Sequence, residues 1–392
     1  MPNGITNAVI AILMPFVLRK HGVPVDRIAE VVAVGGLPWI WYFAYSPIVD
    51  LGLRRRTWIL ISAPGAALLC SIAILLTGGA LPLLTTLLFL ASAVAVLQST
   101  VNGTLLTELS TSVRGRASGW VQAGNLGAGA IGGGVAIWIA GIASLPVLAL
   151  SIFVLITGPA AAAFLLHESQ QEPKPEGERS LSATFGPLWR DLRATFLAPR
   201  TWFGLVFFLS PVGCGALGNL ISSMGPDYHA PDSEVLWVTG IASGLLSAAG
   251  AFVGGYVCDR MNRMVAYALS GGLTAVFALY LMLGPHNAFT FAAGYSGYSI
   301  ANGFAYAVFT ALVLEVLGSR RKASGTAYAI LLSSGNFPIS YMTWIDGLGY
   351  KRWGAMGLTG VDAITEGGGA LLLLLVAWYA RKHWHKNAEA AA

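Results

Sequence analysis

Hydrophobic positions follow one another along this chain in long runs, and polar positions gather in the short connections between the runs. Each run is roughly 20 residues long, which is enough for a helix to cross about 30 Å of hydrocarbon. The pattern predicts an all-α membrane protein. Its twelve predicted spans cover residues 3–18, 30–49, 57–77, 81–107, 117–140, 143–166, 201–223, 235–256, 264–284, 288–316, 323–345 and 358–381.

The longest polar stretch, residues 167–200, separates six spans from six. Its first part, residues 168–178, is rich in Glu, Gln and Pro and predicts a flexible linker. Its second part, residues 181–197, spaces its large apolar side chains as an amphipathic helix on the membrane surface would. The predicted domains are therefore an N-terminal six-helix bundle (1–166), a linker with an amphipathic helix (167–200), and a C-terminal six-helix bundle with its tail (201–392).

Composition agrees with a membrane protein. The chain is 55% hydrophobic and 10% charged, whereas soluble domains average about 25% charged residues. The three cysteines, Cys70, Cys214 and Cys258, lie in apolar stretches without metal-ligand spacing, so we expect free, buried thiols and no metal. The net charge of +5 is modest, and nothing in it calls for a nucleic-acid partner.

The basic residues have a one-sided distribution. Of the 23 Lys and Arg residues, five fall in the odd-numbered connections and the other 18 in the even-numbered connections and the C-terminal tail. By the positive-inside rule, both termini and residues 167–200 are then cytoplasmic in an inner, multi-pass membrane protein. The first span begins almost at Met1 without a basic segment or a cleavage site, so we expect no cleaved signal peptide, and an upstream start is left open.

One phrase occurs twice. Asp50-Leu-Gly-Leu-Arg-Arg-Arg closes the second span, and Asp259-Arg-Met-Asn-Arg closes the eighth. Each is followed, one long hydrophobic segment later, by Glu (108 or 315), basic residues and Ala-Ser-Gly. A chain built as two similar hydrophobic halves is typical of transporters.

These features resemble the major facilitator superfamily, whose motif Gly-x-x-x-Asp-Arg-x-Gly-Arg-Arg follows span 2 and is echoed after span 8. Gly255-Tyr-Val-Cys-Asp-Arg-Met-Asn-Arg263 is similar to that motif, whereas the first copy departs from it at Ser46 and Leu51. Gly35-Gly-Leu-Pro38 and Tyr45-Ser-Pro-Ile-Val-Asp50 resemble the muropeptide-permease and acetyl-CoA-transporter branch. Siderophore permeases look similar in the same region, so the branch does not fix the substrate.

The superfamily resemblance implies a charge network that latches the inner gate. A carboxylate at this depth is costly unless it is paired, and Arg–carboxylate pairs suit a latch that breaks and re-forms. The alternative is that these charges only anchor the topology. In the first half the resemblance groups Asp50, Arg54 or Arg55, Glu108, and Arg114 or Arg116. In the second half it groups Asp259, Arg260, Glu315 and Arg320, with Arg263 as a further candidate.

The resemblance also implies that spans 1, 4, 7 and 10 line a central cavity. On span 4 and on span 10, amide and aromatic side chains share a helix face that points away from Glu108 and Glu315. Spans 1 and 7 add one amide each, and spans 5 and 11 carry neighbouring amides. They suit a larger neutral or zwitterionic solute, or alternatively they form interhelical hydrogen bonds. The candidate substrate-binding residues are Asn7, Gln98, Asn102, Asn125, Asn219, Tyr298, Asn302, Tyr306 and Asn336.

No Gly-Lys-Ser/Thr phrase for ATP occurs, which leaves ion coupling or facilitated diffusion as the way the solute is moved. Asp362 and Glu366 share a helix face and could carry a proton; alternatively they pair with Lys351 or Arg352 at the outer rim.

Taken with the resemblance, the sequence predicts a monomeric, cofactor-free secondary active transporter that imports a muropeptide-like or siderophore-like solute with protons. The alternatives are a drug or metabolite exporter and a membrane-embedded enzyme. The enzyme is disfavoured because the six histidines are scattered over loops and helix ends.

Overall fold

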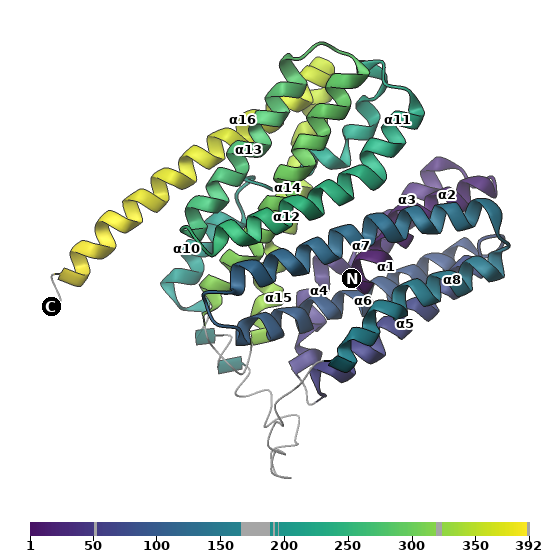
Figure 1. Ribbon diagram of the computed structural model, residues 1–392, viewed down its shortest axis with the longest axis horizontal. Helices are drawn as coiled ribbons and strands as arrows, with labels where there is room; N and C mark the ends of the chain where they lie inside the picture. Colours follow the sequence, from purple (N-terminus) through teal and green to yellow (C-terminus); the bar gives the residue numbers. More distant parts are fainter. Residues whose placement is uncertain (51–52, 166–188, 191–192, 195, 319–323, 390–392) are drawn as a thin grey trace, which may run out of the picture. The chain divides into compact units, whose positions relative to one another are not determined.

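Helices make up almost all of the structure, which is a computed structural model (Figure 1). It describes residues 1–392 except 51–52, 166–188, 191–192, 195, 319–323 and 390–392. No strand occurs among the described residues, which confirms the all-α fold class. Most of the predicted amphipathic helix at 181–197 lies outside them.

The helices of the first 165 residues are separated by short turns (Figure 1). The first helix is continuous, with a π-helical turn in its middle, and the second is divided before Pro38. In chain order these elements are α1 (Pro2–Ala8), η1 (Val9–Leu13), α2 (Met14–Lys20), α3 (Val25–Gly36), α4 (Pro38–Tyr45), η2 (Ser46–Asp50), α5 (Arg55–Leu75), α6 (Leu81–Glu108), α7 (Arg114–Ile142), α8 (Leu145–Thr157) and η3 (Gly158–Leu165).

The helices of residues 199–389 follow the same plan with one exception, a segment that is broken into short turns between Phe208 and Asp232. In chain order they are α10 (Pro199–Phe208), η5 (Ala216–Asn219), η6 (Ile221–Met224), η7 (Pro226–Tyr228), α11 (Asp232–Trp237), η8 (Val238–Ala242), α12 (Ser243–Cys258), α13 (Arg263–Leu283), α14 (Ala288–Leu317), α15 (Ser324–Ser334) and α16 (Asn336–Glu389).

Side chains and backbone turns mark several helix ends. Asn262 precedes α13, and its Oδ1 accepts hydrogen bonds from the backbone N–H groups of Met264 and Val265. Asn287 caps α14 in the same way by accepting from Thr290. These caps satisfy N–H groups that have no partner within the helix, so the polar residues between the apolar runs set where the helices begin.

Ten helices in the described residues are long and apolar enough to cross a membrane. One of them, Gly325–Trp378, contains two spans, because Gly354 has non-helical angles (φ 63°, ψ −151°) and reverses the chain. The broken segment that begins with α10 supplies the remaining span. The twelve predicted spans are therefore accounted for.

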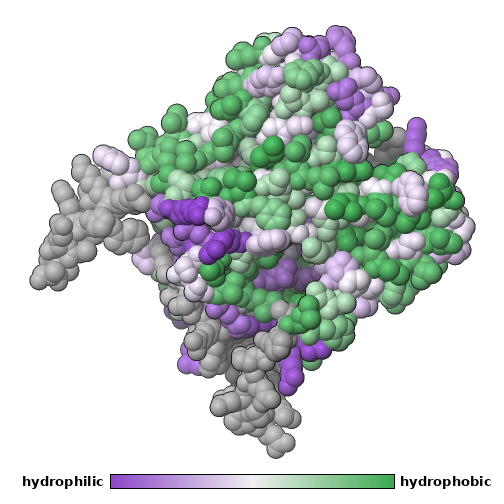
Figure 2. Space-filling model, in the orientation of Figure 1, coloured by the Kyte–Doolittle hydropathy of each residue, from purple (hydrophilic) through white to green (hydrophobic). Residues whose placement is uncertain are grey.

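The surface agrees with a membrane environment. Large hydrophobic side chains are exposed along the spans, among them Trp138, Leu150, Phe252 and Leu372. Figure 2 shows hydrophobic residues covering much of one face of the helices. Hydrophobic side chains exposed in this way are stable when they face the lipid tails of a bilayer.

The chain forms two compact units. Unit 1 comprises residues 1–109, 124–201 and 317–333, and unit 2 comprises 110–123, 202–316 and 334–392. Four helices, α7, α10, α14 and α15, therefore contribute residues to both units. The domain division at residues 166 and 201 stays a prediction.

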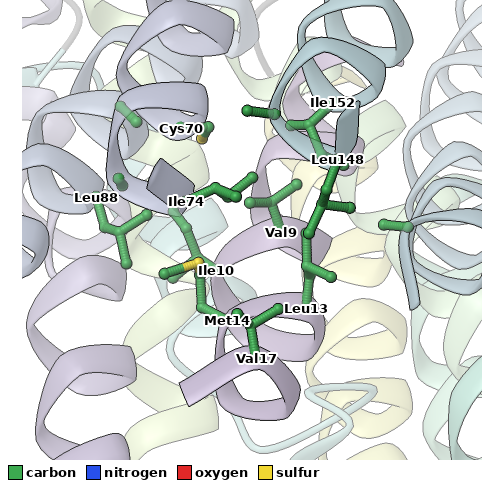
Figure 3. Close-up of a cluster of buried hydrophobic side chains, with 14 of the residues drawn as sticks. Val9, Ile10, Leu13, Met14, Val17, Cys70, Ile74, Leu88, Leu148 and Ile152 are labelled. Carbon is green, nitrogen blue, oxygen red and sulfur yellow. The ribbon is translucent and has the colours of Figure 1, made fainter. Parts of the chain in front are cut away.

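The core of unit 1 surrounds the first helix. Val9, Leu13 and Val17 of this helix meet Ile74 of α5 and Ile152 of α8 in one apolar cluster (Figure 3). The glycine-rich part of α7 packs on the same helix: a Cβ added to Gly132 would meet Ile5, and one added to Gly133 would meet Ala8 and Ile12. Helix packing therefore accounts for this run of glycines.

The core of unit 2 includes the broken segment. Leu217, Ile221 and Met224 of the short turns are buried against Phe291 of α14 and Leu358 of α16. Figure 1 shows α13 beside α16, and these two helices form the most extensive helix–helix contact in the unit.

Candidate functional site

Charged side chains gather at helix ends in both units. In unit 1, Arg55 begins α5, Glu108 ends α6, and the two form an ion pair. Arg54, the neighbour of Arg55, is exposed and makes no ion pair within the described part of the chain. The side chain of Asp50 lies outside what the structure describes.

In unit 2, Asp259 caps the start of α7. Its Oδ1 accepts the backbone N–H of Gly115 at 2.8 Å, and its Oδ2 accepts the N–H of Arg116 at 3.1 Å. The Nε of Arg116 lies 2.9 Å from Oδ2 of Asp259. A carboxylate in this place compensates both the free N–H groups and the positive end of the helix dipole.

Arg263 connects Asp259 to the rest of this cluster. Its guanidinium lies 4.0 Å from Asp259 and 3.3 Å from Glu315, and it donates a 2.7 Å hydrogen bond to the carbonyl of Thr111. The guanidinium of the buried Arg114 donates to the carbonyl of Leu314 at 3.3 Å. We refer to these six residues as the charge network, which consists of Thr111, Arg114, Arg116, Asp259, Arg263 and Glu315.

The charge network differs from the expected grouping. The sequence placed Arg114 and Arg116 beside Glu108, but both lie with the acids of unit 2, because the N-terminus of α7 presents its N–H groups to Asp259. Arg260, expected beside Asp259, is exposed and stacks on the ring of Tyr256. Arg320 lies outside the described residues.

The amide candidates of unit 1 lie on α1, α6 and α7. Asn7 is exposed and Asn102 half-buried, whereas Gln98 is 3% exposed and its Nε2 has no hydrogen-bond partner among the described residues. Asn125 lies against Gly4, where its backbone oxygen leaves no room for a Cβ. Asn3, which the sequence did not single out, donates to Ser99 Oγ at 3.0 Å and ties α1 to α6.

In unit 2 the amide candidates lie near the broken segment. Asn219, within this segment, donates to Thr343 Oγ1 at 2.9 Å. Asn302 of α14 lies against Gly215, one helical turn before Tyr306, and has a buried Oδ1 without a partner among the described residues. Asn336 begins α16 and is half-buried.

Tyr298 occupies a different environment from the amide candidates. It is buried in the core of unit 2, and its hydroxyl lies 3.5 Å from Oδ1 of Asp362.

Three carboxylic acids lie inside unit 2. Asp346, Asp362 and Glu366 are each 0% exposed. Glu366 accepts hydrogen bonds from the Gly213 N–H at 2.5 Å and from Thr274 Oγ1 at 3.0 Å. We refer to Asp346, Asp362 and Glu366 as the acid cluster.

The basic residues considered as partners for these acids are elsewhere. Lys351 and Arg352 are exposed, and neither forms an ion pair within the described ranges. The acids do not converge on a metal site either: no group of three or more His, Cys, Asp or Glu side chains in the searched residues has the geometry to hold a metal ion.

Comparison with known proteins decides the family. The model of the Major Facilitator Superfamily matches residues 1–341. The chain belongs to this superfamily. Two solved structures share its fold: FucP, a Major Facilitator Superfamily transporter in the outward conformation (14% identity, TM-score 0.59), and the human organic anion transporter MFSD10 (16% identity, TM-score 0.61). Each comparison covers 95% of this chain and 97% of the other.

Membership of the Major Facilitator Superfamily makes the chain a multi-pass membrane transporter. Sequence reasoning missed two features of its unit 2. Asp346 is not among the predicted site residues, and the break after Phe208 was not predicted. Pro211, Gly213 and Gly215 crowd the break, and a hydrophobic span interrupted by Pro and Gly is a signal that could have found it.

Proposed function

We propose that this chain is a proton-coupled secondary transporter that imports a medium-sized neutral or zwitterionic solute across the cytoplasmic membrane, with both termini cytoplasmic. The observation that carries the coupling is the acid cluster, buried in unit 2 without a basic partner among the described residues. Ionisable residues inside a membrane protein are costly and mark ion or proton pathways. Asp362 and Glu366 are the residues that the sequence indicated for this role.

The substrate class follows from the candidate side chains. Gln98, Asn302 and Tyr306 offer neutral hydrogen-bond donors and acceptors, and aromatic rings stack on sugar or ring systems. All Lys, Arg and His residues lie in connections or at helix ends of the predicted spans, which disfavours a compact dianion. Muropeptide-like and siderophore-like solutes fit this chemistry, in keeping with the branch resemblance.

Uptake by proteoliposomes tests this proposal. The purified protein is first screened by thermal shift against anhydromuropeptides, ferric siderophores, sugars and acyl-CoA compounds, because a ligand that binds the folded state raises the melting temperature. The solute that stabilises the protein should then accumulate when the outside is acidic, and a protonophore should abolish the accumulation. Accumulation only in vesicles of the opposite orientation would identify an exporter, and conversion of the solute in detergent would identify an enzyme.

For the charge network we propose a gating role. Arg263 contacts two acids that belong to different helix ends, so one side chain joins the end of α12 to the end of α14. Replacing Glu315 by Gln removes one charge from this junction, and we expect slower transport by a protein that is still folded and inserted. Transport at the wild-type rate by this variant would leave the network with an anchoring role only.

A further inference from the structure

The break in the seventh span exposes backbone groups that a continuous helix would pair. In an uninterrupted helix the Gly213 N–H would donate to the Leu209 carbonyl four residues earlier. Pro211 has no N–H, and Gly213 and Gly215 have φ values of 66° and 73°, in the left-handed region that favours glycine. Each freed group must find another partner inside unit 2.

Side chains of other helices supply those partners. The Gly213 N–H donates to Glu366, and the Leu209 carbonyl accepts the hydroxyl of Tyr341 at 2.8 Å. The hydroxyl of Tyr267 donates to the Val212 carbonyl at 2.7 Å. One carboxylate and two hydroxyl groups therefore replace the helical hydrogen bonds of the break.

Glu366 is satisfied as a carboxylate. Its Oε2 accepts from Gly213 and from Thr274, and its Oε1 lies 3.9 Å from the thiol Sγ of Cys214. All three partners are donors, which suits a group that only accepts when it is ionised. Hydrogen bonds from a backbone N–H to a charged acceptor are among the stronger ones in proteins.

The two aspartates of the acid cluster are not satisfied in this way. Neither carboxylate oxygen of Asp346 has a hydrogen-bond partner among the described residues, and the same holds for Oδ2 of Asp362. The other oxygen of Asp362 has only the distant Tyr298 hydroxyl at 3.5 Å. An unpaired buried carboxylate is costly, whereas the neutral acid is tolerated.

Position and surroundings set these aspartates apart as a pair. Asp346 lies eight residues before Gly354 and Asp362 eight residues after it, on the two arms of the hairpin in α16, whose Gly349 and Gly357 are in contact. The two aspartates therefore lie at about the same depth, roughly 12 Å from the turn at 1.5 Å per residue.

Among the described residues, no Lys, Arg or His forms an ion pair with the acid cluster. The titratable groups that act on the acid cluster are the other acids, the thiol of the broken segment, and hydroxyl groups of α13, α14 and α16, namely Cys214, Tyr267, Tyr298, Tyr306 and Tyr341. All of these groups are neutral or negative.

We propose that Asp346 and Asp362 hold the coupled proton, and that Glu366 is a positioning residue whose carboxylate maintains the break in the seventh span. This assignment rests on the proposed proton coupling and divides the acid cluster into two roles. The sequence indicated Asp362 and Glu366 as the proton-carrying pair, whereas the present assignment replaces Glu366 by Asp346 in that role.

Infrared difference spectroscopy tests the first role. The protein in lipid nanodiscs is compared between about pH 5 and about pH 9, a range wide enough to include shifted carboxyl groups. The C=O stretch of a buried carboxylic acid should decrease on alkalinisation, and Asp346→Asn or Asp362→Asn should remove it. The band should persist in Glu366→Gln. A band that persists in both aspartate variants, or that disappears only in Glu366→Gln, would overturn the assignment.

The native thiol of Cys214 tests the second role, in a background where the other two cysteines are alanine. Glu366→Gln should raise the rate of maleimide labelling at Cys214 about tenfold or more, because a hydrogen bond to a charged group contributes about 1.5–3 kcal/mol and 1.4 kcal/mol is a factor of ten. Tyr341→Phe, which frees the Leu209 carbonyl, should act in the same direction. Asp346→Asn is the matched control and should label at the parent rate. Parent rates in both Glu366→Gln and Tyr341→Phe would contradict the positioning role.

Failure of this assignment of roles can be distinguished from failure of the proposed proton coupling. If uptake by the wild-type protein does not depend on the proton gradient, the coupling proposal fails, whatever the variants show. If uptake is proton-driven and the carboxylic acid band survives both aspartate variants, only the present assignment fails. Replacing sodium by choline in the same buffers should leave the spectra unchanged, and a sodium-dependent band would identify a sodium site instead.

Discussion

At the scale of single residues, Gln98 and Ser99 are neighbours with different surroundings. Gln98 points a hydrogen-bond donor into unit 1 that meets no acceptor among the described residues, whereas Ser99 accepts from Asn3 at 3.0 Å. Unpaired buried amides are rare, because each costs about 1–3 kcal/mol. Gln98 is therefore available to bind a ligand, whereas Ser99 holds two helices together.

We predict that Gln98→Ala weakens substrate binding about 2- to 12-fold, the effect of losing one neutral hydrogen bond of about 0.5–1.5 kcal/mol. The melting temperature should stay the same or rise, because the amide has no protein partner to lose. Affinity and melting temperature are measured on the same purified variant. Ser99→Ala is the control, with unchanged affinity and a loss of about 1 kcal/mol in the free energy of unfolding. The reverse pattern would make Gln98 a packing residue.

Asp259 gives a second prediction at this scale. Asp259→Ala removes the cap of α7 and the partner of Arg116, so we expect the free energy of unfolding to fall by about 0.5–2 kcal/mol, the usual effect of losing an N-cap. Asp259→Asn keeps an acceptor oxygen and should lose less. Chemical unfolding in detergent measures both. Arg260→Ala serves as the control, because this exposed side chain stacks on Tyr256 and forms no ion pair among the residues described. Equal losses in Asp259→Ala and Arg260→Ala would argue against capping.

At the scale of elements, α7 and α12 approach each other closely at one crossing. A Cβ added to Gly119 of α7 would lie 2.7 Å from the Ala251 carbonyl oxygen and 2.9 Å from Gly255 Cα of α12. Real Cβ atoms do not come this close, so the crossing depends on glycine at position 119.

Gly119→Ala should therefore lower the free energy of unfolding by about 1–3 kcal/mol, as overpacking does elsewhere. Gly141→Ala, in the same helix, is the matched control, because an added Cβ there meets nothing within 4 Å. It should stabilise the helix by up to about 1 kcal/mol, since alanine favours a helix more than glycine does. Thermal unfolding of the two purified variants decides the matter, and similar melting temperatures would contradict this account of the crossing.

The elements also show how far sequence patterns reach. Apolar run length predicted the spans, because crossing a bilayer imposes a length that few other structures need. The sequence pattern predicted only part of the acid cluster. Asp362 and Glu366 share a helix face at a fixed spacing, whereas Asp346 joins them from the other arm of a hairpin. Helical spacing relates residues within one helix only. The pairing of Arg116 with Asp259 was hidden for the same reason.

At the scale of the whole molecule, the distribution of Lys and Arg predicts the orientation in the membrane. Five of the 23 basic residues lie in the connections assigned to the outside. The family match makes the protein multi-pass, and the side on which each connection lies is tested by chemical labelling.

Single cysteines placed at Ser180 and Ser233, in a background without Cys70, Cys214 and Cys258, should label from opposite sides. Ser233 is exposed at the start of α11, and Ser180 lies outside the described residues, within the predicted cytoplasmic linker. A membrane-impermeant maleimide added to intact cells should reach only Ser233→Cys, and Ser180→Cys should react only after permeabilisation. Labelling of Ser233→Cys from the inside would overturn the twelve-span topology.

The break in the seventh span also bears on how the protein is made. Ribosomes synthesise a chain from its N-terminus, so Gly213 enters the membrane long before Glu366 and Tyr341 have been translated. Until then, a continuous helix is the way to pair the Gly213 N–H in lipid. The seventh span is therefore expected to insert as an ordinary helix and to open only when the last hairpin arrives. Chains that end before residue 366 would lack the carboxylate that pairs with the Gly213 N–H of the open segment. We expect quality-control proteases to degrade such chains, because their C-terminal helices have not finished folding.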